Sequence, residues 1–152
     1  MTARNRLVAL AAGGSLALLL GAFLFQALGY APCKLCLWQR WPHGAAIAIG
    51  ALAVLTGLRW LPWAGALAAL TTGGLGVYHT GVEQGWWKGP TTCTSGDALS
   101  SSTGDLLGQI MTAPLVRCDD IAWSFVGLSM ATWNAILSVI LAAIWVAAAR
   151  RA

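Results

Sequence analysis

The chain has 152 residues, of which 58% are hydrophobic and only 9% are charged, and its formal net charge is +4. An ordinary soluble domain carries about 25% charged residues, so this composition excludes a soluble globular protein and indicates a membrane protein. The basic excess does not indicate nucleic-acid binding, because no basic patch with interleaved aromatic residues lies in a polar segment. We expect a single domain over residues 1–152.

Four apolar segments are each long enough to cross a hydrocarbon core about 30 Å thick. Lipid cannot satisfy backbone N–H and C=O groups, and no alternating strand pattern is present, so each segment should be a helix. The sequence therefore predicts an all-α membrane protein, a bundle of four transmembrane helices joined by two loops on one side of the membrane. The predicted spans cover residues 7–28, 41–58, 60–82 and 125–149, and the two loops cover residues 29–40 and 83–124.

A cleaved secretory signal is the alternative interpretation of the first span, since Arg4 and Arg6 precede its apolar run. That run is longer than the roughly 7–15 apolar residues of a signal peptide. The sequence Tyr30-Ala31-Pro32-Cys33 is also a poor cleavage site. We therefore expect the first span to be retained.

The basic residues predict the orientation of the bundle. Segments rich in Arg and Lys stay in the cytoplasm, and the arginines gather before the first span, between the second and third, and after the fourth. Both termini should therefore be cytoplasmic, and the two loops, which hold all four cysteines, should be extracytoplasmic. The arginines concerned are Arg4, Arg6, Arg59, Arg150 and Arg151.

Cys33 and Cys36 form a C-x-x-C motif in the first loop. This spacing allows a reversible short-loop disulfide and lowers the pKa of one thiol. Haem attachment would require His at position 37, where this chain has Leu37, and a zinc site would require a second close cysteine pair, so we expect no metal. A purely structural disulfide remains the alternative, because an oxidising compartment permits it.

Arg40 follows Cys36 by one helical turn if the second helix begins near Leu35. On the same helix face, its guanidinium would stabilise a thiolate or an anionic partner. From its position alone, Arg40 could equally be an anchor that reaches the lipid headgroups.

The long second loop carries Cys93 and Cys118. The residues around Cys93 are polar and typical of turns, so we expect this thiol to be mobile and accessible to another protein. Between the two cysteines, apolar residues recur at helical spacing, which predicts a short helix lying on the membrane or buried against the bundle. These residues are Leu106, Leu107, Ile110 and Met111.

Several of these motifs occur together, and in the same order, in a known family. The chain resembles the DsbB family of disulfide-generating membrane proteins over most of its length. The resemblance is carried by the apolar first span, the Pro32-Cys33-Lys34-Leu35-Cys36 motif with Arg40, the stretch from Tyr78-His79 through Glu83 and Gly89-Pro90 to Cys93, and Cys118 followed by Trp123, Phe125-Val126-Gly127-Leu128, Met130 and Trp133-Asn134.

The resemblance implies an enzyme of the bacterial inner membrane with its cysteine loops in the periplasm. Cys36 would pass electrons to ubiquinone or menaquinone beside Arg40, with Cys33 as its disulfide partner. Cys93 would be attacked by a reduced thioredoxin-fold DsbA-like protein, and Cys118 would relay the electrons to Cys33. The family thus implies a quinone-dependent oxidase that re-oxidises a periplasmic dithiol protein.

The sequence also suggests roles for the two histidines, for a glycine cluster and for Ala131. His79 matches a family position and could line the quinone pocket, although a histidine packed at a helix end is the commoner case. His43 should lie at the membrane interface, and Gly73, Gly74 and Gly76 should pack helices instead of forming a quinone slot. Ala131 replaces a proline found in many relatives, which affects a helix start and no chemistry.

Two other functions remain open. A vitamin K epoxide reductase-like oxidoreductase shares the helical bundle and the C-x-x-C motif, but its loop cysteines usually precede that motif, whereas here Cys93 and Cys118 follow it. A non-catalytic four-span scaffold with inert disulfides is the second alternative, and it would form no mixed disulfide with a DsbA-like protein.

Overall fold

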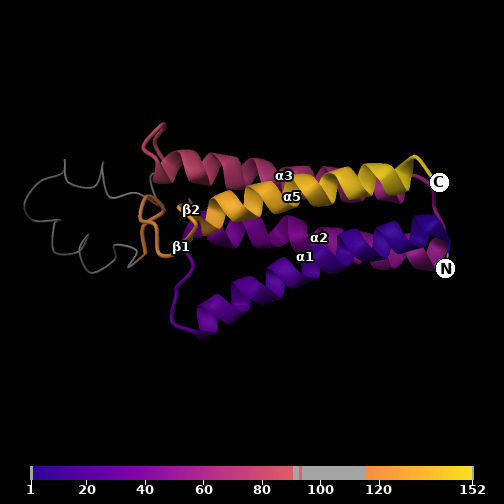
Figure 1. The fold of residues 1–152 in the computed structure, drawn as a ribbon, viewed down its shortest axis with the longest axis horizontal. Coiled ribbons are helices and arrows are strands. Elements are labelled where there is room, and N and C mark those ends of the chain that lie inside the picture. The colour runs from indigo at the N-terminus through magenta and orange to yellow at the C-terminus, as the bar shows by residue number, and fades with distance from the viewer. Residues whose placement is uncertain (1, 91–92, 94–115, 152) are drawn as a thin grey trace, which may run out of the picture.

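The structure is a computed structural model, and it describes residues 2–90, 93 and 116–151. Within these residues the fold is an elongated bundle of four helices (Figure 1). The helices are α1 (Ala3–Ala27), α2 (Lys34–Thr56), α3 (Leu61–Glu83) and α5 (Met130–Ala149). Both termini lie at one end of the bundle, and the loops after α1 and α3 lie at the other (Figure 1). The predicted helix over Leu106–Met111 falls outside the described residues.

The helical prediction is confirmed, and part of the membrane prediction is supported. Among the described helices, α1 and α5 are long and apolar enough to cross a membrane. α2 and α3 have similar lengths, but Gln39, Arg40 and His43 interrupt α2, and threonines and glycines dilute α3. That all four helices cross the membrane therefore stays a prediction.

α2 begins at Lys34, earlier than the span predicted from residue 41, because the cysteine motif itself starts the helix. Cys33 is the N-cap, and its sulfur accepts a hydrogen bond from the backbone N–H of Cys36. This bond satisfies one of the N–H groups that a helix start leaves without a partner. α2 ends at Gly57, whose φ of 69° is the left-handed conformation that glycine adopts without strain.

The fourth helix begins at Met130, so the prediction that it starts at residue 125 is wrong. Residues 124–129 instead form a two-stranded hairpin of β1 (Ser124–Phe125) and β2 (Leu128–Ser129). Val126 and Gly127 turn the chain with φ angles of 53° and 75°, the pair of positive values typical of a tight hairpin. Ser129 then caps α5 by accepting a hydrogen bond from the N–H of Thr132.

Small residues allow α3 to pack closely against α5. A Cβ atom added at Gly76 would lie 3.0 Å from the carbonyl oxygen of Ala131, and one added at Gly65 would lie 2.6 Å from the buried Trp145 ring. Gly73 also faces α5, whereas Gly74 faces open space. The prediction that this glycine cluster packs helices is therefore confirmed for Gly73 and Gly76.

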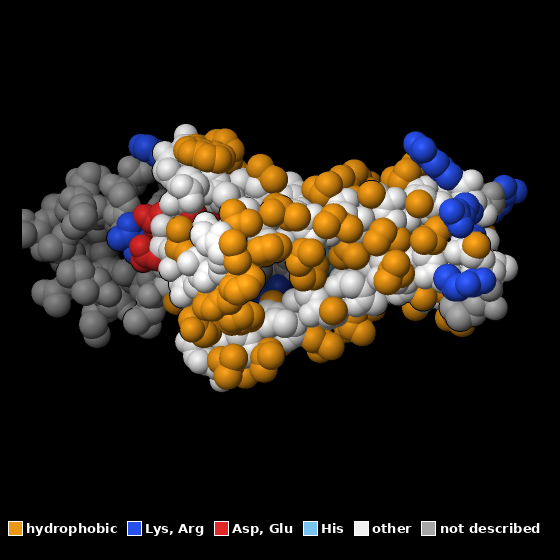
Figure 2. All heavy atoms as spheres, in the orientation of Figure 1, with side chains coloured by type: hydrophobic (Ala, Val, Ile, Leu, Met, Phe, Trp, Pro, Cys, Tyr) orange, Lys and Arg blue, Asp and Glu red, His pale blue; other side chains and the backbone are white. Residues whose placement is uncertain are grey.

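α1 packs against the other helices only along its first half. Its buried residues are Val8, Ala11 and Ser15, whereas Phe23 and Leu24 near its end are 50% and 59% exposed. Figure 1 shows the end of α1 diverging from the bundle. The divergence opens a hollow between α1 and the remaining helices (Figure 2).

We predict that Gly65→Ala lowers the free energy of unfolding by about 1–3 kcal/mol, because the new methyl group overlaps a buried indole that has no room to move. Gly74→Ala in the same helix is the matched control. It should be neutral or stabilise by up to about 1 kcal/mol, since alanine favours a helix and this position is open. Unfolding in detergent micelles, followed by circular dichroism, measures the free energy of unfolding of both variants. Equal changes in the two variants would contradict close packing of Gly65 against Trp145.

Candidate functional site

The C-x-x-C motif lies at the start of α2, where the helix N-terminus faces the loops. The two sulfur atoms are 2.7 Å apart and are not joined in a disulfide. Cys33 is buried and Cys36 is partly exposed. Because the sulfur of Cys33 also accepts the Cys36 N–H, the motif and the helix cap are one local structure.

The thiol of Cys33 is held in its protonated form. Its hydrogen bond to the sulfur of Cys36, together with burial, raises the pKa of Cys33 well above its ordinary value. When the pair is reduced and loses one proton, Cys33 therefore donates its remaining proton toward Cys36. The negative charge falls on the sulfur that is partly exposed.

Cys93 and Cys118 form a disulfide that packs directly on the motif. Their Cα atoms are 5.3 Å apart, and the N–H of Cys118 donates to the carbonyl oxygen of Cys93. Both residues are buried in a cluster with Cys33, Leu35 and Val82. The structure thus brings all four predicted cysteines together, but the expectation of an accessible Cys93 is wrong for this arrangement, in which Cys93 is 1% exposed.

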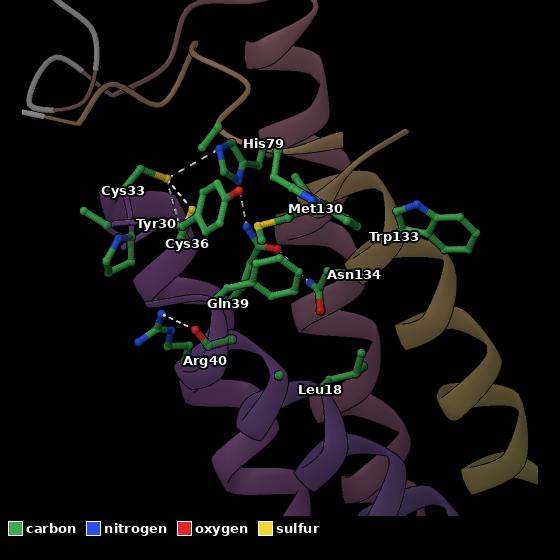
Figure 3. Close-up of a pocket in the computed structure, with 18 of the residues that line it drawn as sticks. Leu18, Tyr30, Cys33, Cys36, Gln39, Arg40, His79, Met130, Trp133 and Asn134 are labelled. Atoms are coloured by element: carbon green, nitrogen blue, oxygen red, sulfur yellow. Dashed lines mark hydrogen bonds between the residues drawn. The ribbon is translucent and has the colours of Figure 1, made fainter. Parts of the chain in front are cut away.

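His79 is positioned between the cysteines and the polar interior. Its Nε2 lies 3.5 Å from the sulfur of Cys33 and 3.8 Å from Oε1 of Glu83, and the ring also lies within hydrogen-bonding reach of the Cys118 backbone. Nδ1 accepts a hydrogen bond of 2.9 Å from the carboxamide of Gln39. His79 lines the cavity, a position that the sequence left open beside simple packing at a helix end, and it does so as part of the thiol cluster (Figure 3).

A buried polar network links α2, α3 and α5 below the thiols. Asn134 donates to Gln39 Oε1 at 2.7 Å and to the hydroxyl of Thr72 at 3.2 Å. Thr72 in turn donates to the backbone carbonyl of Gln39. From the sequence alone, Gln39 and Thr72 had no predicted role, and Asn134 was only part of the family pattern.

His43 belongs to the same network, so the expectation that it lies at the membrane interface is wrong. It is 3% exposed, and its Nε2 donates to Oδ1 of Asn134 at 2.9 Å. The spacing could have indicated this, because Gln39 and His43 are four residues apart on one face of an otherwise apolar helix. A polar side chain that faces apolar helices needs partners, and Asn134 supplies one.

The order of donors and acceptors in this network fixes the protonation of His79. Asn134 donates its N–H to Gln39 Oε1, and Gln39 donates its own N–H to Nδ1 of His79. A neutral imidazole that accepts at Nδ1 carries its proton on Nε2. The N–H of His79 therefore points toward the sulfur of Cys33.

A cavity of about 270 Å³ opens beside Cys36 between α1, α2 and α5. Its walls are mostly apolar and include Leu18 and Phe25 of α1 and Met130 of α5. Cys36 and Arg40 also line it, and Figure 3 shows them on neighbouring turns of α2. An apolar hollow with a few polar groups at one edge is the usual form of a small-molecule site.

Arg40 connects α2 to the diverging end of α1. Its guanidinium donates to Gln26 Oε1 at 2.7 Å and to the carbonyl oxygen of Ala22, and it lies 4.8 Å from the centre of the Phe23 ring. Within the described residues its buried Nε has no hydrogen-bond partner. Arg40 therefore both lines the cavity and ties α2 to α1.

The known proteins that this chain resembles all carry the same description. The family model described as disulfide bond formation protein DsbB matches residues 4–148. Disulfide bond formation protein B of Albidiferax ferrireducens is 31% identical over 95% of this chain and 87% of its own length. The protein of the same name from Paracidovorax citrulli is 32% identical over 92% of this chain and 83% of its own length. No solved structure gives a significant match.

We predict that Thr72→Val lowers the free energy of unfolding by about 1–3 kcal/mol, because it removes the hydroxyl that joins Gln39 to Asn134 and leaves buried polar groups without partners. Thr71→Val is a matched control, since Thr71 is exposed and its hydroxyl bonds only to Leu67 of its own helix. Thermal unfolding in detergent compares the two variants. A Thr72 variant as stable as the Thr71 variant would show that the network does not hold the helices together.

Proposed function

The chain belongs to the DsbB family, and from this premise we propose that it is a membrane thiol:quinone oxidoreductase that sustains disulfide bond formation. It would re-oxidise a periplasmic DsbA-like dithiol protein and pass the electrons to a membrane quinone, ubiquinone or menaquinone. Family membership makes the chain a disulfide bond formation protein of the membrane. The choice of electron donor and acceptor is the proposal.

The observation that carries the proposal is the stacking of the two cysteine pairs. Cys33 is buried in one cluster with the Cys93–Cys118 disulfide and lies 2.7 Å from the sulfur of Cys36; both residues of the motif line the cavity, and of the four cysteines only Cys36 is partly exposed. Thiol–disulfide exchange requires a thiolate to approach a disulfide sulfur directly. The closeness of Cys33 to both the loop disulfide and Cys36 favours that approach at each step.

Each proposed exchange step breaks one S–S bond and forms another. A thiolate of the partner attacks Cys93, breaking the Cys93–Cys118 bond and forming a mixed disulfide. The partner's second thiolate then attacks its own sulfur in that mixed disulfide and leaves oxidised, so the loop pair holds the two electrons. Cys118 next attacks Cys33 of an oxidised Cys33–Cys36 pair, and Cys93 closes on Cys118, which leaves Cys33 and Cys36 reduced.

The burial of Cys93 places one condition on this series of exchange steps. At 1% exposure, its sulfur offers a partner no line of attack while it packs on Leu35 and Val82. The loop must therefore move away from these two side chains before the first mixed disulfide forms. Partner binding and loop release would be coupled.

The cavity beside Cys36 fits a quinone. Its apolar walls suit a quinone ring and isoprenoid tail, and the guanidinium of Arg40 at its edge would stabilise negative charge that develops on a bound oxygen. When bound, the quinone would supply the two-electron acceptor that the cysteine pairs lack. His79, with its Nε2–H near Cys33, would line the inner part of this site.

We further propose that the end bearing the cysteines faces the periplasm across the bacterial inner membrane. Basic side chains gather at the end where both termini lie, whereas the acidic side chains that Figure 2 shows lie at the other end. This distribution agrees with the preference of basic segments for the cytoplasm.

Cys36→Ser should abolish quinone reduction, because serine cannot form the disulfide that the quinone must regenerate. The measurement is the fall in quinone absorbance when purified protein, a reduced DsbA-like protein and ubiquinone are mixed. The control is Cys118→Ala, which should also stop turnover but should trap a mixed disulfide between Cys93 and the partner. Full quinone-linked turnover by the Cys36→Ser protein would disprove the assigned role, and absence of the trapped species would favour an inert scaffold.

Arg40→Ala should raise the apparent KM for quinone or lower the rate by about tenfold or more, since one charged hydrogen bond to a developing oxyanion contributes on the order of 2–3 kcal/mol. Arg4→Ala is the control, because Arg4 also ties α1 to another part of the chain, the link between α2 and α3, through the carbonyl oxygen of Leu58, but at the opposite end. Steady-state kinetics at varied quinone concentration distinguish them. An identical quinone dependence in the two variants would leave Arg40 as an anchor only.

A further inference from the structure

Three side chains that can ligate metals converge at the top of α2 and α3, and the carboxylate of Glu83 lies beside one of them. The sulfurs of Cys33 and Cys36 and a ring nitrogen of His79 lie within 4.8 Å of one another. Glu83, one turn after His79, places Oε1 3.8 Å from Nε2 of that ring. Cysteine spacing alone predicted no metal, because the sequence offers no second close pair, but the fold brings two further ligands from a different helix.

One edge of this group already has the length found in a tetrahedral zinc site, and the others must adjust. With Zn–S of about 2.3 Å and Zn–N of about 2.0–2.1 Å, a tetrahedron separates sulfur from nitrogen by about 3.5 Å. The sulfur of Cys33 is 3.5 Å from Nε2 of His79. The two sulfurs, at 2.7 Å, must separate by about 1 Å. Cys36 is partly exposed beside the cavity, which leaves its side chain room to rotate.

Neighbouring residues hold two of these ligands in place, as in protein metal sites. Gln39 hydrogen-bonds to Nδ1 of His79 and directs Nε2 at the sulfurs, and Ser129 donates to Oε2 of Glu83 while Oε1 faces the ring. A cation would replace the proton on Nε2, which would move to Nδ1. To accept a hydrogen bond from Nδ1, Gln39 would have to exchange the positions of its carboxamide oxygen and nitrogen, and Asn134, which donates to Gln39 Oε1, would have to do the same.

We infer that the reduced Cys33–Cys36 pair forms, with His79 and Glu83, a binding site for a thiophilic divalent cation of the Zn²⁺ type. Two thiolates, one imidazole and one carboxylate are ligands that Zn²⁺ prefers. They would give the complex a net charge of −1, which the Arg40 guanidinium lining the same cavity would offset. The site exists only when the pair is reduced, because a disulfide uses both sulfurs.

This inference is independent of the proposed function, since it requires only that the two thiols can be reduced. Its consequence is that the bound cation and the Cys33–Cys36 disulfide exclude each other. Micromolar Zn²⁺ should therefore hold the pair reduced and prevent it from closing. The same ion should leave the oxidised protein unaffected.

The test is a titration of the protein in detergent with Cd²⁺, whose bonds to sulfur absorb in the ultraviolet, followed by displacement with Zn²⁺. Replacing Cys93 and Cys118 by serine leaves only the motif to bind. The reduced protein should take up one Cd²⁺ per chain, and the oxidised protein none. His79→Gln and Glu83→Gln should each weaken binding by tenfold or more, whereas Asp120→Asn, at an exposed carboxylate of the same end, should not.

Circular dichroism of each variant confirms that it is folded before titration. Equal affinity in the reduced protein and in both the His79→Gln and Glu83→Gln variants would mean that two thiols alone bind the ion, which overturns the four-ligand site. Failure of the reduced protein to bind Cd²⁺ would overturn it as well. Neither result would bear on electron transfer to quinone, so the two proposals are tested separately.

Discussion

The hydrogen bonds among Gln39, Asn134 and His79 are the constraint on which the rest of the site depends. In an apolar helical bundle, a buried carboxamide without a partner costs several kcal/mol, so each polar group fixes the position of the next. Gln39 belongs to α2, His79 to α3 and Asn134 to α5, so satisfying all three sets the mutual rotation of these helices. The position of His79 beside Cys33 follows from that rotation.

Close packing and open space alternate along the bundle because of where the small residues lie. Gly65, Gly73 and Gly76 bring α3 against α5 over most of its length, and the polar network then joins these helices to α2. α1 contributes no residue to the network, and beyond Ser15 none of its residues is buried. The cavity therefore forms beside α1, and Arg40 bonds across it to the one helix that diverges.

The sequence sufficed for the parts of the fold that depend on composition and spacing. Long apolar segments gave the four helices, and the C-x-x-C motif gave the reactive pair. It did not reveal the hairpin at residues 124–129, because Val126 in a left-handed conformation contradicts its own preference for strands and helices. The role of His43 was missed because its partner, Asn134, lies 91 positions away, and single-residue reasoning cannot pair such residues.

The gathering of all four cysteines also explains why a buried thiol suits this site better than an exposed one. Cys33 packs in one cluster with the loop disulfide and lies 2.7 Å from the sulfur of Cys36, so in the proposed function it can exchange with either pair. Solvent exposure would admit small oxidants and stray thiols to the central sulfur, since thiolate reactivity follows access. In the proposed function, burial would confine exchange to the protein's own cysteines, and the raised pKa of Cys33 would favour negative charge on Cys36. Packing thus leaves Cys36 as the accessible sulfur of the motif.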